Sequence, residues 1–345
     1  MENLDRRLSS YDFDLPESQI AQTAAEPRDS AKLLVYSRAT GQAEDRAFRD
    51  ITEYLQPGDV LVRNATRVIP ARLYFVRQSG ARHEVFLTRP LEDSRWEAMI
   101  DKSARVKAGE VLTHMETGTQ IEVIDEPGQQ TRVIKPREPK TFWDFVQKVG
   151  EVPLPKYIKA RPRHSGRYQT VYAEMGTSVA APTAGLHWTP ELLEKVRAKG
   201  VEIVDVFLDV GLGTFKPVQV DDITDHKMHS EGFTIPDAAA QAVNAAKKEG
   251  RRVVAVGTTT VRALESAWAA TGLQSGESET NIFIYPGYEF RVVDALITNF
   301  HLPKSSLLMM ISAFIGDRQK TLDLYQHAIE SNYRFYSFGD SSFII

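Results

Sequence analysis

The sequence predicts an α/β main domain, with a barrel-like sheet covered by helices, into which a small antiparallel β-barrel is inserted. After Pro153, apolar strand-like runs alternate with helix-like segments, which is typical of an α/β domain. Between about 71 and 151, short β-rich runs recur at a spacing of roughly ten residues, which is typical of a small barrel or sandwich. We therefore expect a main domain over 1–70 and 153–345 and an insertion over 71–152.

Turn signals separate the β-rich runs of the insertion. Ser79-Gly80, Ala108-Gly109 and Pro127-Gly128 end successive runs, because Gly and Pro supply the backbone conformations that turns need. The expected strands cover 71–77, 83–90, 95–100, 120–125 and 131–136.

The helices of the main domain carry start and stop signals. Thr189, in a Thr-Pro pair, starts a helix that ends at Gly200, and Pro236 and Gly250 bracket another. Nearly continuous apolar runs between the helices are typical of buried strands. The expected strands are 201–211, 251–257 and 292–300, and a further helix is expected over 304–316.

Composition excludes several classes of protein. The chain of 345 residues is 42% hydrophobic and 26% charged, which is ordinary for a globular protein. It has no Cys, which excludes disulfide scaffolds, Cys-ligated metals and thiol catalysis. The N-terminus has no apolar signal region, and the longest apolar stretch, 307–315, is too short to cross a membrane. We expect a soluble, cytoplasmic protein.

Two segments are basic although the whole chain has a net charge of −4. Residues 60–83 and 153–167 each carry five Lys or Arg side chains and no acidic residue. They form either a local phosphate-binding surface or two solvated loops, and charge alone leaves both interpretations open.

Common nucleotide-binding motifs are absent. A G-x-G-x-x-G motif that begins at Gly211 would need its third glycine at Lys216, and there is no Walker A sequence. Polar residues gather instead where the expected strands end, which is where open α/β sheets bind ligands. These clusters are 64–67, 181–187, 225–231, 257–262 and 298–301.

Four side chains of these clusters allow three interpretations. His226, His229, Glu231 and His301 have ligand types that suit zinc or iron. The histidines also suit general acid–base catalysis near neutral pH. The third interpretation is that they only satisfy backbone groups at strand ends.

Other clusters favour ligand binding. Residues 257–260 form a strand-to-helix turn whose hydroxyl and N–H groups suit an anion, and Arg262 either joins them or pairs with Glu265. Thr183 lies on a constrained turn. Tyr168 and Gln169 follow the second basic segment, where aromatic and amide groups suit a flipped-out base. A buried strand end is the alternative interpretation of these two residues.

Ordered segments of the chain resemble S-adenosylmethionine:tRNA ribosyltransferase-isomerases, a family of queuosine biosynthesis. The resemblance extends from Tyr11 to Ile345 and is weakest within the insertion. The segments are YDFDLP, PGDVLVRNATRVIPARL, LPKYI, RYQTVYA, VAAPTAGLHWT, GLGTFKPV, DHKMHSE, VGTTTVRALES, IFIYPGY, VDALITNFHLPKSSLLMMISAF and YRFYSFGD.

The resemblance implies transfer of the ribosyl part of S-adenosylmethionine to 7-aminomethyl-7-deazaguanine at the tRNA wobble position. Isomerisation then gives epoxyqueuosine, and adenine and methionine leave. S-adenosylmethionine is a consumed co-substrate, so the resemblance implies no cofactor and no metal. The partners it implies are tRNA and S-adenosylmethionine. We also expect a monomer that does not bind membranes.

Residue types and clusters then suggest roles within that reaction. His187, His229, His301 and Asp209 are the catalytic candidates. The candidates for binding S-adenosylmethionine are Thr183, Trp188, Phe215, Thr258, Thr259 and Arg262, with Phe300 a further aromatic candidate. The candidates for binding tRNA are Asn64, Thr66, Arg67, Arg72, Lys159, Arg161, Arg163, Arg167, Tyr168 and Gln169.

The chain departs from the family pattern at four positions. Asp209 stands where a histidine is usual, Trp188 where a phenylalanine is usual, Ala65 where Asp or Asn is usual, and His164 where an aspartate is common. Two alternatives therefore remain. One is a metal-dependent hydrolase that uses His226, His229 and His301, and the other is a tRNA-binding relative without catalysis.

Overall fold

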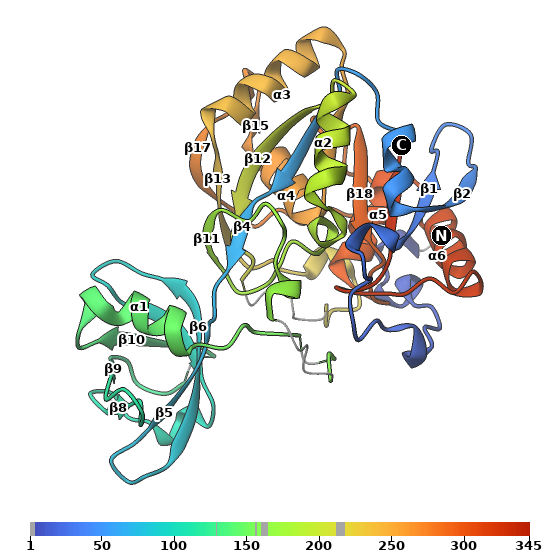
Figure 1. The fold of residues 1–345 in the computed structure, drawn as a ribbon. Coiled ribbons are helices and arrows are strands. Elements are labelled where there is room, and N and C mark those ends of the chain that lie inside the picture. The colour runs from blue at the N-terminus through green and yellow to red at the C-terminus, as the bar shows by residue number, and fades with distance from the viewer. Residues whose placement is uncertain (1–3, 129, 156, 160–164, 212–217) are drawn as a thin grey trace.

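The computed structural model describes residues 4–128, 130–155, 157–159, 165–211 and 218–345. Its main feature is an open nine-stranded sheet in the order β17-β13-β12-β3-β14-β18-β19-β1-β2. Helices of the main domain lie on both faces of this sheet, and a smaller β-domain, which carries α1, lies to one side (Figure 1). The chain is α/β with an inserted antiparallel barrel, as predicted. The large sheet has free edges at β17 and β2, so it is open and not barrel-like. The closed barrel is the smaller domain.

The centre of the sheet is parallel, and β3, β14 and β18 are buried along their whole length. Here β3 (Val60–Asn64) lies between β12 (Glu202–Leu208) and β14 (Val253–Val256), and β14 pairs with β18 (Ala295–Asn299). Strands β12, β14 and β18 confirm the predicted apolar runs. A strand that is covered on both faces of the sheet needs apolar side chains on both faces.

Antiparallel and edge strands complete the sheet. On one side, β13 (Glu231–Ile235) pairs with β12 and β17 (Gly276–Thr280). On the other side, β19 (Ser341–Ile344), β1 (Lys32–Tyr36) and β2 (Ala43–Ala47) follow β18.

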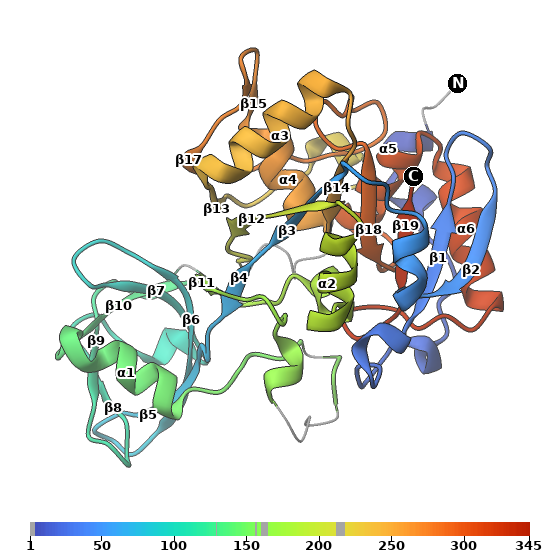
Figure 2. The same ribbon diagram turned by 45° about the horizontal axis from the view of Figure 1, so that its top comes forward.

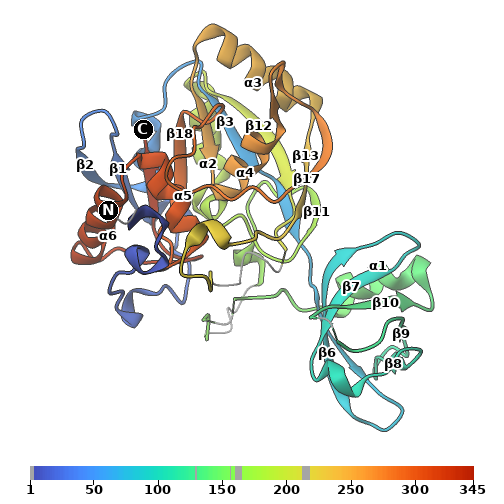
Figure 3. The same ribbon diagram turned by 180° about the vertical axis from the view of Figure 1, so that it is seen from behind.

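Side chains of successive strand residues point to opposite faces and form two cores. One core contains Val60 and Val62 and is covered by α3 (Asp237–Glu249), α4 (Thr258–Ala267), α5 (Ser306–Ile315) and α6 (Arg318–Glu330). The other contains Leu61 and is covered by α2 (Pro190–Ala198). Figure 1 shows α2 in front of the sheet, and Figure 3, from behind, shows α4 and α5 in front.

The predicted helix signals are confirmed. The Thr189 hydroxyl accepts a hydrogen bond from the Leu192 N–H (3.1 Å) at the start of α2. Gly250 ends α3 with a φ of 70°, a left-handed conformation that suits glycine. Helix α5 covers the predicted segment and is capped by Ser305. Helix α6 was not predicted.

The smaller domain is a closed barrel of six strands in the order β10-β7-β6-β5-β8-β9. Its strands are β5 (Arg72–Val76), β6 (Arg82–Pro90), β7 (Trp96–Ile100), β8 (Val111–Thr113), β9 (Gln120–Val123) and β10 (Arg132–Pro136). The five predicted strands are confirmed, whereas β8 was missed because three residues carry too little pattern. Helix α1 (Pro139–Val149), also not predicted, packs Phe142 and Phe145 into the barrel core.

The chain enters and leaves the barrel side by side. Arg72 and Glu151 exchange two backbone hydrogen bonds, of 3.1 Å and 2.9 Å. Two short strands, β4 (Thr66–Val68) and β11 (Met175–Ser178), pair in parallel beside this junction, and Figure 2 shows them between the sheet and the barrel. The predicted domain boundaries at 70/71 and 152/153 remain a prediction.

Candidate functional site

A pocket of about 540 Å³ lies at the carboxyl ends of β14 and β18. Open α/β sheets bind ligands at this position, and the volume suits a ligand the size of a nucleoside derivative. The lining joins segments that are far apart in the sequence. It comprises Tyr157, Tyr168, 180–184, Val210, Val218, 257–259, 298–307, Tyr336 and Ser337.

The strand-to-helix turn after β14 forms one wall. Gly257 has a φ of 90°, and its N–H donates to the Ile297 carbonyl (2.7 Å), so this glycine is required by the backbone conformation. Thr258 and Thr259 follow at the first turn of α4 and line the pocket. Their hydroxyls lie beside the positive end of a ten-residue helix, an arrangement that favours an anionic group.

The end of β18 forms a second wall, which includes His301. His301 Nε2 lies 3.0 Å from the Thr298 hydroxyl, and the His301 backbone N–H donates to the Tyr325 hydroxyl (3.2 Å). Burial lowers the pKa of His301 to about 3. The imidazole is therefore neutral at pH 7, and it acts as a hydrogen-bonding group rather than as a cation.

Asn299 also lines this wall and was not among the predicted site residues. Its Nδ2 donates to the Tyr336 carbonyl (3.0 Å), which ties the end of β18 to the segment that carries Tyr336. Tyr157 and Tyr336 were missed too, because they come from segments 179 positions apart whose aromatic residues carry no periodic signal. The motifs LPKYI and YRFYSFGD contain them, but the sequence does not show that they meet.

The structure brings five of the predicted site residues to the pocket. Thr183, Thr258, Thr259, His301 and Tyr168 all line it, as does Phe300. Tyr168 is 1% exposed and its ring packs edge-on against Phe338, so it forms part of the pocket wall. Their individual roles stay predictions.

The structure corrects the placement of His187 and Trp188. Trp188 is completely buried and contacts Phe48 edge-on in the core beneath α2, so its ring faces no ligand. The ring of His187 stacks on Phe48, and its Nε2 lies 2.8 Å from the Gly339 carbonyl. Burial lowers the pKa of His187, and neither residue lines the pocket.

Lowering the pH from 7 to 4 is expected to reduce the free energy of unfolding, partly through His301. The unfolded chain binds this proton below about pH 6.5, whereas the folded chain binds it only near pH 3. Stability therefore falls as the pH falls between these values, by up to about 1.4 kcal/mol per pH unit for one such histidine. Urea unfolding at several pH values measures the slope. The variant His301→Gln should show a shallower slope, and an equal slope contradicts the prediction.

Asn64, Thr66 and Asp209 form an internal network beside the pocket. The Asn64 amide donates to the Leu208 carbonyl (3.0 Å) and to the Thr259 hydroxyl (3.2 Å). The Asp209 carboxylate accepts hydrogen bonds from the hydroxyls of Thr66 and Thr177 and from the Thr177 N–H. Asn64 and Thr66 are both 0% exposed, which corrects the expectation that they meet a tRNA base.

Replacing Asp209 with asparagine is expected to leave turnover within about threefold of the original. In the structure this carboxylate joins β4 and β11 to the end of β12 and does not line the pocket, and the amide keeps one acceptor oxygen. A group that transfers protons would cost roughly a hundredfold or more. Steady-state kinetics of Asp209→Asn and Asp209→Ala decide between these roles. A hundredfold loss in Asp209→Asn, with an unchanged melting temperature, contradicts the prediction.

Arg262 pairs with Glu231 and not with Glu265. The side chains of Arg262 and Glu231 are 5% and 2% exposed and form a direct ion pair. Glu265 instead accepts backbone N–H groups from the loop before β18, including those of Arg291 and Val292 (3.0 Å each). Arg262 does not line the pocket, so its predicted contact with a carboxylate has no support from this geometry.

The described residues among those predicted to bind tRNA have partners within the protein. Arg67 is exposed and donates to the carbonyls of Ala173 and Glu174, and Lys159 is exposed and pairs with Glu17. Arg72 faces Glu84, Arg167 pairs with Glu26, and the Gln169 amide bonds the backbone of Val68. The predicted residues Arg161, Arg163 and Phe215 lie outside the described part of the chain.

The histidines of the metal hypothesis do not form a metal centre with one another. His229 is exposed, His226 packs edge-on against Phe283, and only His301 lines the pocket. Burial, together with the charge of His229, lowers the pKa of His226. Within the described residues no group of three or more His, Asp or Glu side chains is placed to hold a metal ion.

No helix in the same part of the chain is long and apolar enough to span a bilayer.

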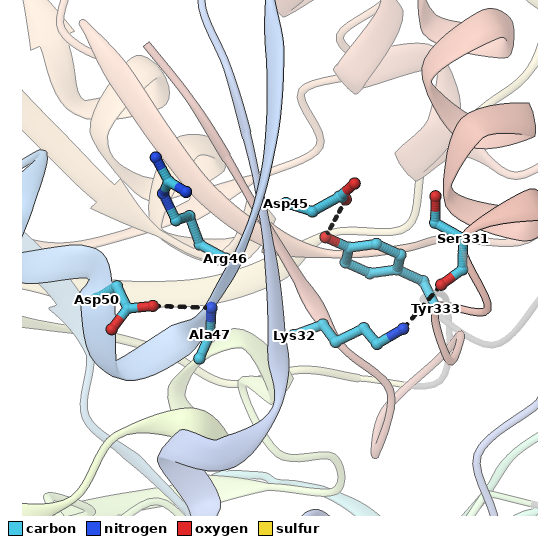
Figure 4. A pocket seen from close by; sticks show the side chains of 7 residues that line it. All are labelled: Lys32, Asp45, Arg46, Ala47, Asp50, Ser331 and Tyr333. Atoms are coloured by element: carbon cyan, nitrogen blue, oxygen red, sulfur yellow. Dashed lines mark hydrogen bonds between the residues drawn. The ribbon is translucent and has the colours of Figure 1, made fainter.

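A second depression, of about 420 Å³, lies beside β2 and is polar. Figure 4 shows three hydrogen-bonded pairs among its lining residues, and Arg46 pairs with Glu44, which is not drawn. Lys32 donates to the Ser331 carbonyl (2.7 Å), the Tyr333 hydroxyl donates to Asp45 (2.6 Å), and Asp50 accepts the Ala47 N–H (3.0 Å). The pocket at the end of β18 is therefore the better candidate.

An open α/β sheet with a ligand-sized pocket at the carboxyl ends of its strands is typical of α/β proteins that bind small molecules. The chain belongs to the family described as "Queuosine biosynthesis protein", whose model matches residues 8–344. It is 50% identical to the S-adenosylmethionine:tRNA ribosyltransferase-isomerase of Fusobacterium nucleatum, over 98% of this chain and 96% of that protein. It is 48% identical to the Desulforamulus reducens protein of the same name, over 98% and 100%. A crystal structure of S-adenosylmethionine tRNA ribosyltransferase from Thermotoga maritima matches with a TM-score of 0.58 and 36% identity, covering 98% and 100% of the two chains.

Proposed function

We propose that this protein is an S-adenosylmethionine:tRNA ribosyltransferase-isomerase. It transfers the ribosyl part of S-adenosylmethionine to 7-aminomethyl-7-deazaguanine in tRNA and isomerises it to epoxyqueuosine, and adenine and methionine are released. The observation that carries the proposal is full-length similarity, at about half of all positions, to relatives that bear this name. The partners are S-adenosylmethionine and tRNA, and the reaction uses no cofactor.

The pocket at the end of β18 holds S-adenosylmethionine in this proposal. Thr258 and Thr259, at the start of α4, bind its carboxylate, since backbone N–H groups and hydroxyls converge there. Thr183, which also lines the pocket, hydrogen-bonds a ribose hydroxyl. His301 is neutral and donates a hydrogen bond to the leaving adenine or to an oxygen on which charge develops.

A hydrolase that uses a metal is not retained as an alternative, because His226 and His229 lie outside the pocket that contains His301. A tRNA-binding protein without catalysis remains the second candidate. The exposed Arg67 and Lys159 fit it, since they suit phosphate contacts whether or not a reaction follows.

The test is a reaction of the purified protein with S-adenosylmethionine and tRNA that carries the aminomethyl-deazaguanine base. Nucleoside mass spectrometry should detect epoxyqueuosine, and chromatography should detect an equal amount of free adenine. Bound tRNA without either product would instead favour the protein without catalysis. We also propose that the protein acts as a cytoplasmic monomer. Light scattering of the purified protein tests the oligomeric state.

A further inference from the structure

Among the residues that the structure describes, the pocket at the end of β18 offers no carboxylate to a cationic ligand. None of its described lining residues is Asp or Glu, and the charged side chain among them is Lys304. The Lys304 ammonium pairs with Asp12, 2.5 Å away, outside the lining. A positive centre that binds here therefore has to be stabilised by other means, and aromatic ring faces attract cations.

Two of the four aromatic residues in the lining present accessible rings. Tyr168 and Phe300 are 1% and 0% exposed, so they support the wall from behind. Tyr157 and Tyr336 are half-buried, and their ring centroids lie 4.3 Å apart at a tilt of 44°. Burial raises the pKa of both hydroxyls, which keeps both rings neutral.

The backbone holds Tyr336 in a conformation that few bulky residues adopt. Its φ is 74°, in the left-handed region, where a bulky side chain is strained. Three hydrogen bonds impose this conformation. The Tyr336 N–H donates to the Phe300 carbonyl (3.1 Å), and the Tyr336 carbonyl accepts from Gly339 N–H (2.9 Å) and Asn299 Nδ2 (3.0 Å). Such strain persists where the surrounding structure imposes it, and it gathers at functional sites.

Tyr157 supports Tyr336 from the other side. Its hydroxyl donates to the Ser337 hydroxyl and accepts the Ser337 N–H (3.2 Å), so it is fixed to the residue that follows Tyr336. The paired rings thus form a preorganised aromatic surface that adapts little when a ligand binds.

We infer that Tyr336, supported by Tyr157, determines specificity by placing its ring against the sulfonium of S-adenosylmethionine. This inference rests on the proposed function, which supplies the ligand. The ring favours the sulfonium over the neutral thioether of S-adenosylhomocysteine, because the negative face of an aromatic ring attracts a cation and not an uncharged sulfur.

The test compares the dissociation constants of both ligands by titration calorimetry. The original protein and Tyr336→Phe, which keeps the ring, should prefer S-adenosylmethionine. The preference is measured as the dissociation constant of S-adenosylhomocysteine divided by that of S-adenosylmethionine. In Tyr336→Asn and Tyr336→Leu this ratio should fall about tenfold. Asn tolerates a positive φ, so Tyr336→Asn removes the ring without the strain and remains informative if Tyr336→Leu does not fold. Tyr74→Leu, in the barrel, makes the same change away from the pocket and should leave the ratio unchanged.

The outcomes separate this inference from the proposed function. If the original protein binds S-adenosylmethionine but both ring-removing variants keep its preference, the role of Tyr336 is wrong and the proposed function stands. Equal weakening of both ligands also overturns the inference, because it indicates a structural contribution only. If the original protein binds neither ligand in the calorimeter, the inference fails, whereas the proposed function is decided separately by the formation of epoxyqueuosine with tRNA present.

Discussion

Replacing Glu231 with alanine is expected to lower the free energy of unfolding by about 3–5 kcal/mol. Glu231 forms the ion pair with Arg262 in the interior, where water does not reach either side chain. The guanidinium has no other partner within the described residues, since Arg262 Nε and Nη2 are buried without hydrogen bonds. Removal of the carboxylate therefore leaves a buried charge without compensation. It also removes an acceptor for the Gly211 N–H (3.0 Å).

Urea unfolding followed by circular dichroism measures this effect. Glu231→Gln should cost less than Glu231→Ala, because the amide retains an oxygen that accepts from Arg262. Glu249→Ala is a matched control, since Glu249 also pairs with an arginine, Arg251, but at the surface, where such pairs contribute at most about 1 kcal/mol. A loss in Glu231→Ala no greater than in the control would falsify the prediction.

Replacing His301 with alanine is expected to reduce turnover about a hundredfold. His301 lies at the end of β18, lines the pocket, and has its ring oriented by the Thr298 hydroxyl. Loss of one preorganised hydrogen-bond donor in a water-poor site typically costs a hundredfold to a thousandfold. The measurement is the single-turnover rate of adenine release with saturating S-adenosylmethionine.

The shape of the pH–rate profile tests how His301 acts. Because burial lowers its pKa to about 3, His301 does not titrate between pH 5 and 8. His301→Gln should therefore lower the rate at every pH without moving an inflection in that range. The control is His327→Ala, an exposed histidine on α6 that pairs with Asp45, and its rate should stay unchanged. Disappearance of an inflection near pH 6 in His301→Gln would show acid–base catalysis instead.

The central strands and helices of the main domain could be predicted because local patterns specify them. Buried strands such as β12, β14 and β18 are continuous apolar runs, and α2 and α3 have capping residues at their ends. Strand β2 has no such pattern. Its residues, AEDRA, are nearly all exposed at the sheet edge, so their pairing with β1 depends on tertiary contacts.

The sequence by itself also placed Thr183, Thr258, Thr259 and His301 at a site, since the ends of parallel strands meet at one edge of a sheet. It did not show which way each side chain faces. Only the tertiary structure directed His187 and Trp188 into the core and joined Tyr157 to Tyr336. The physical reason is that these positions depend on long-range packing between distant segments, whereas capping and alternation are set by immediate neighbours along the chain.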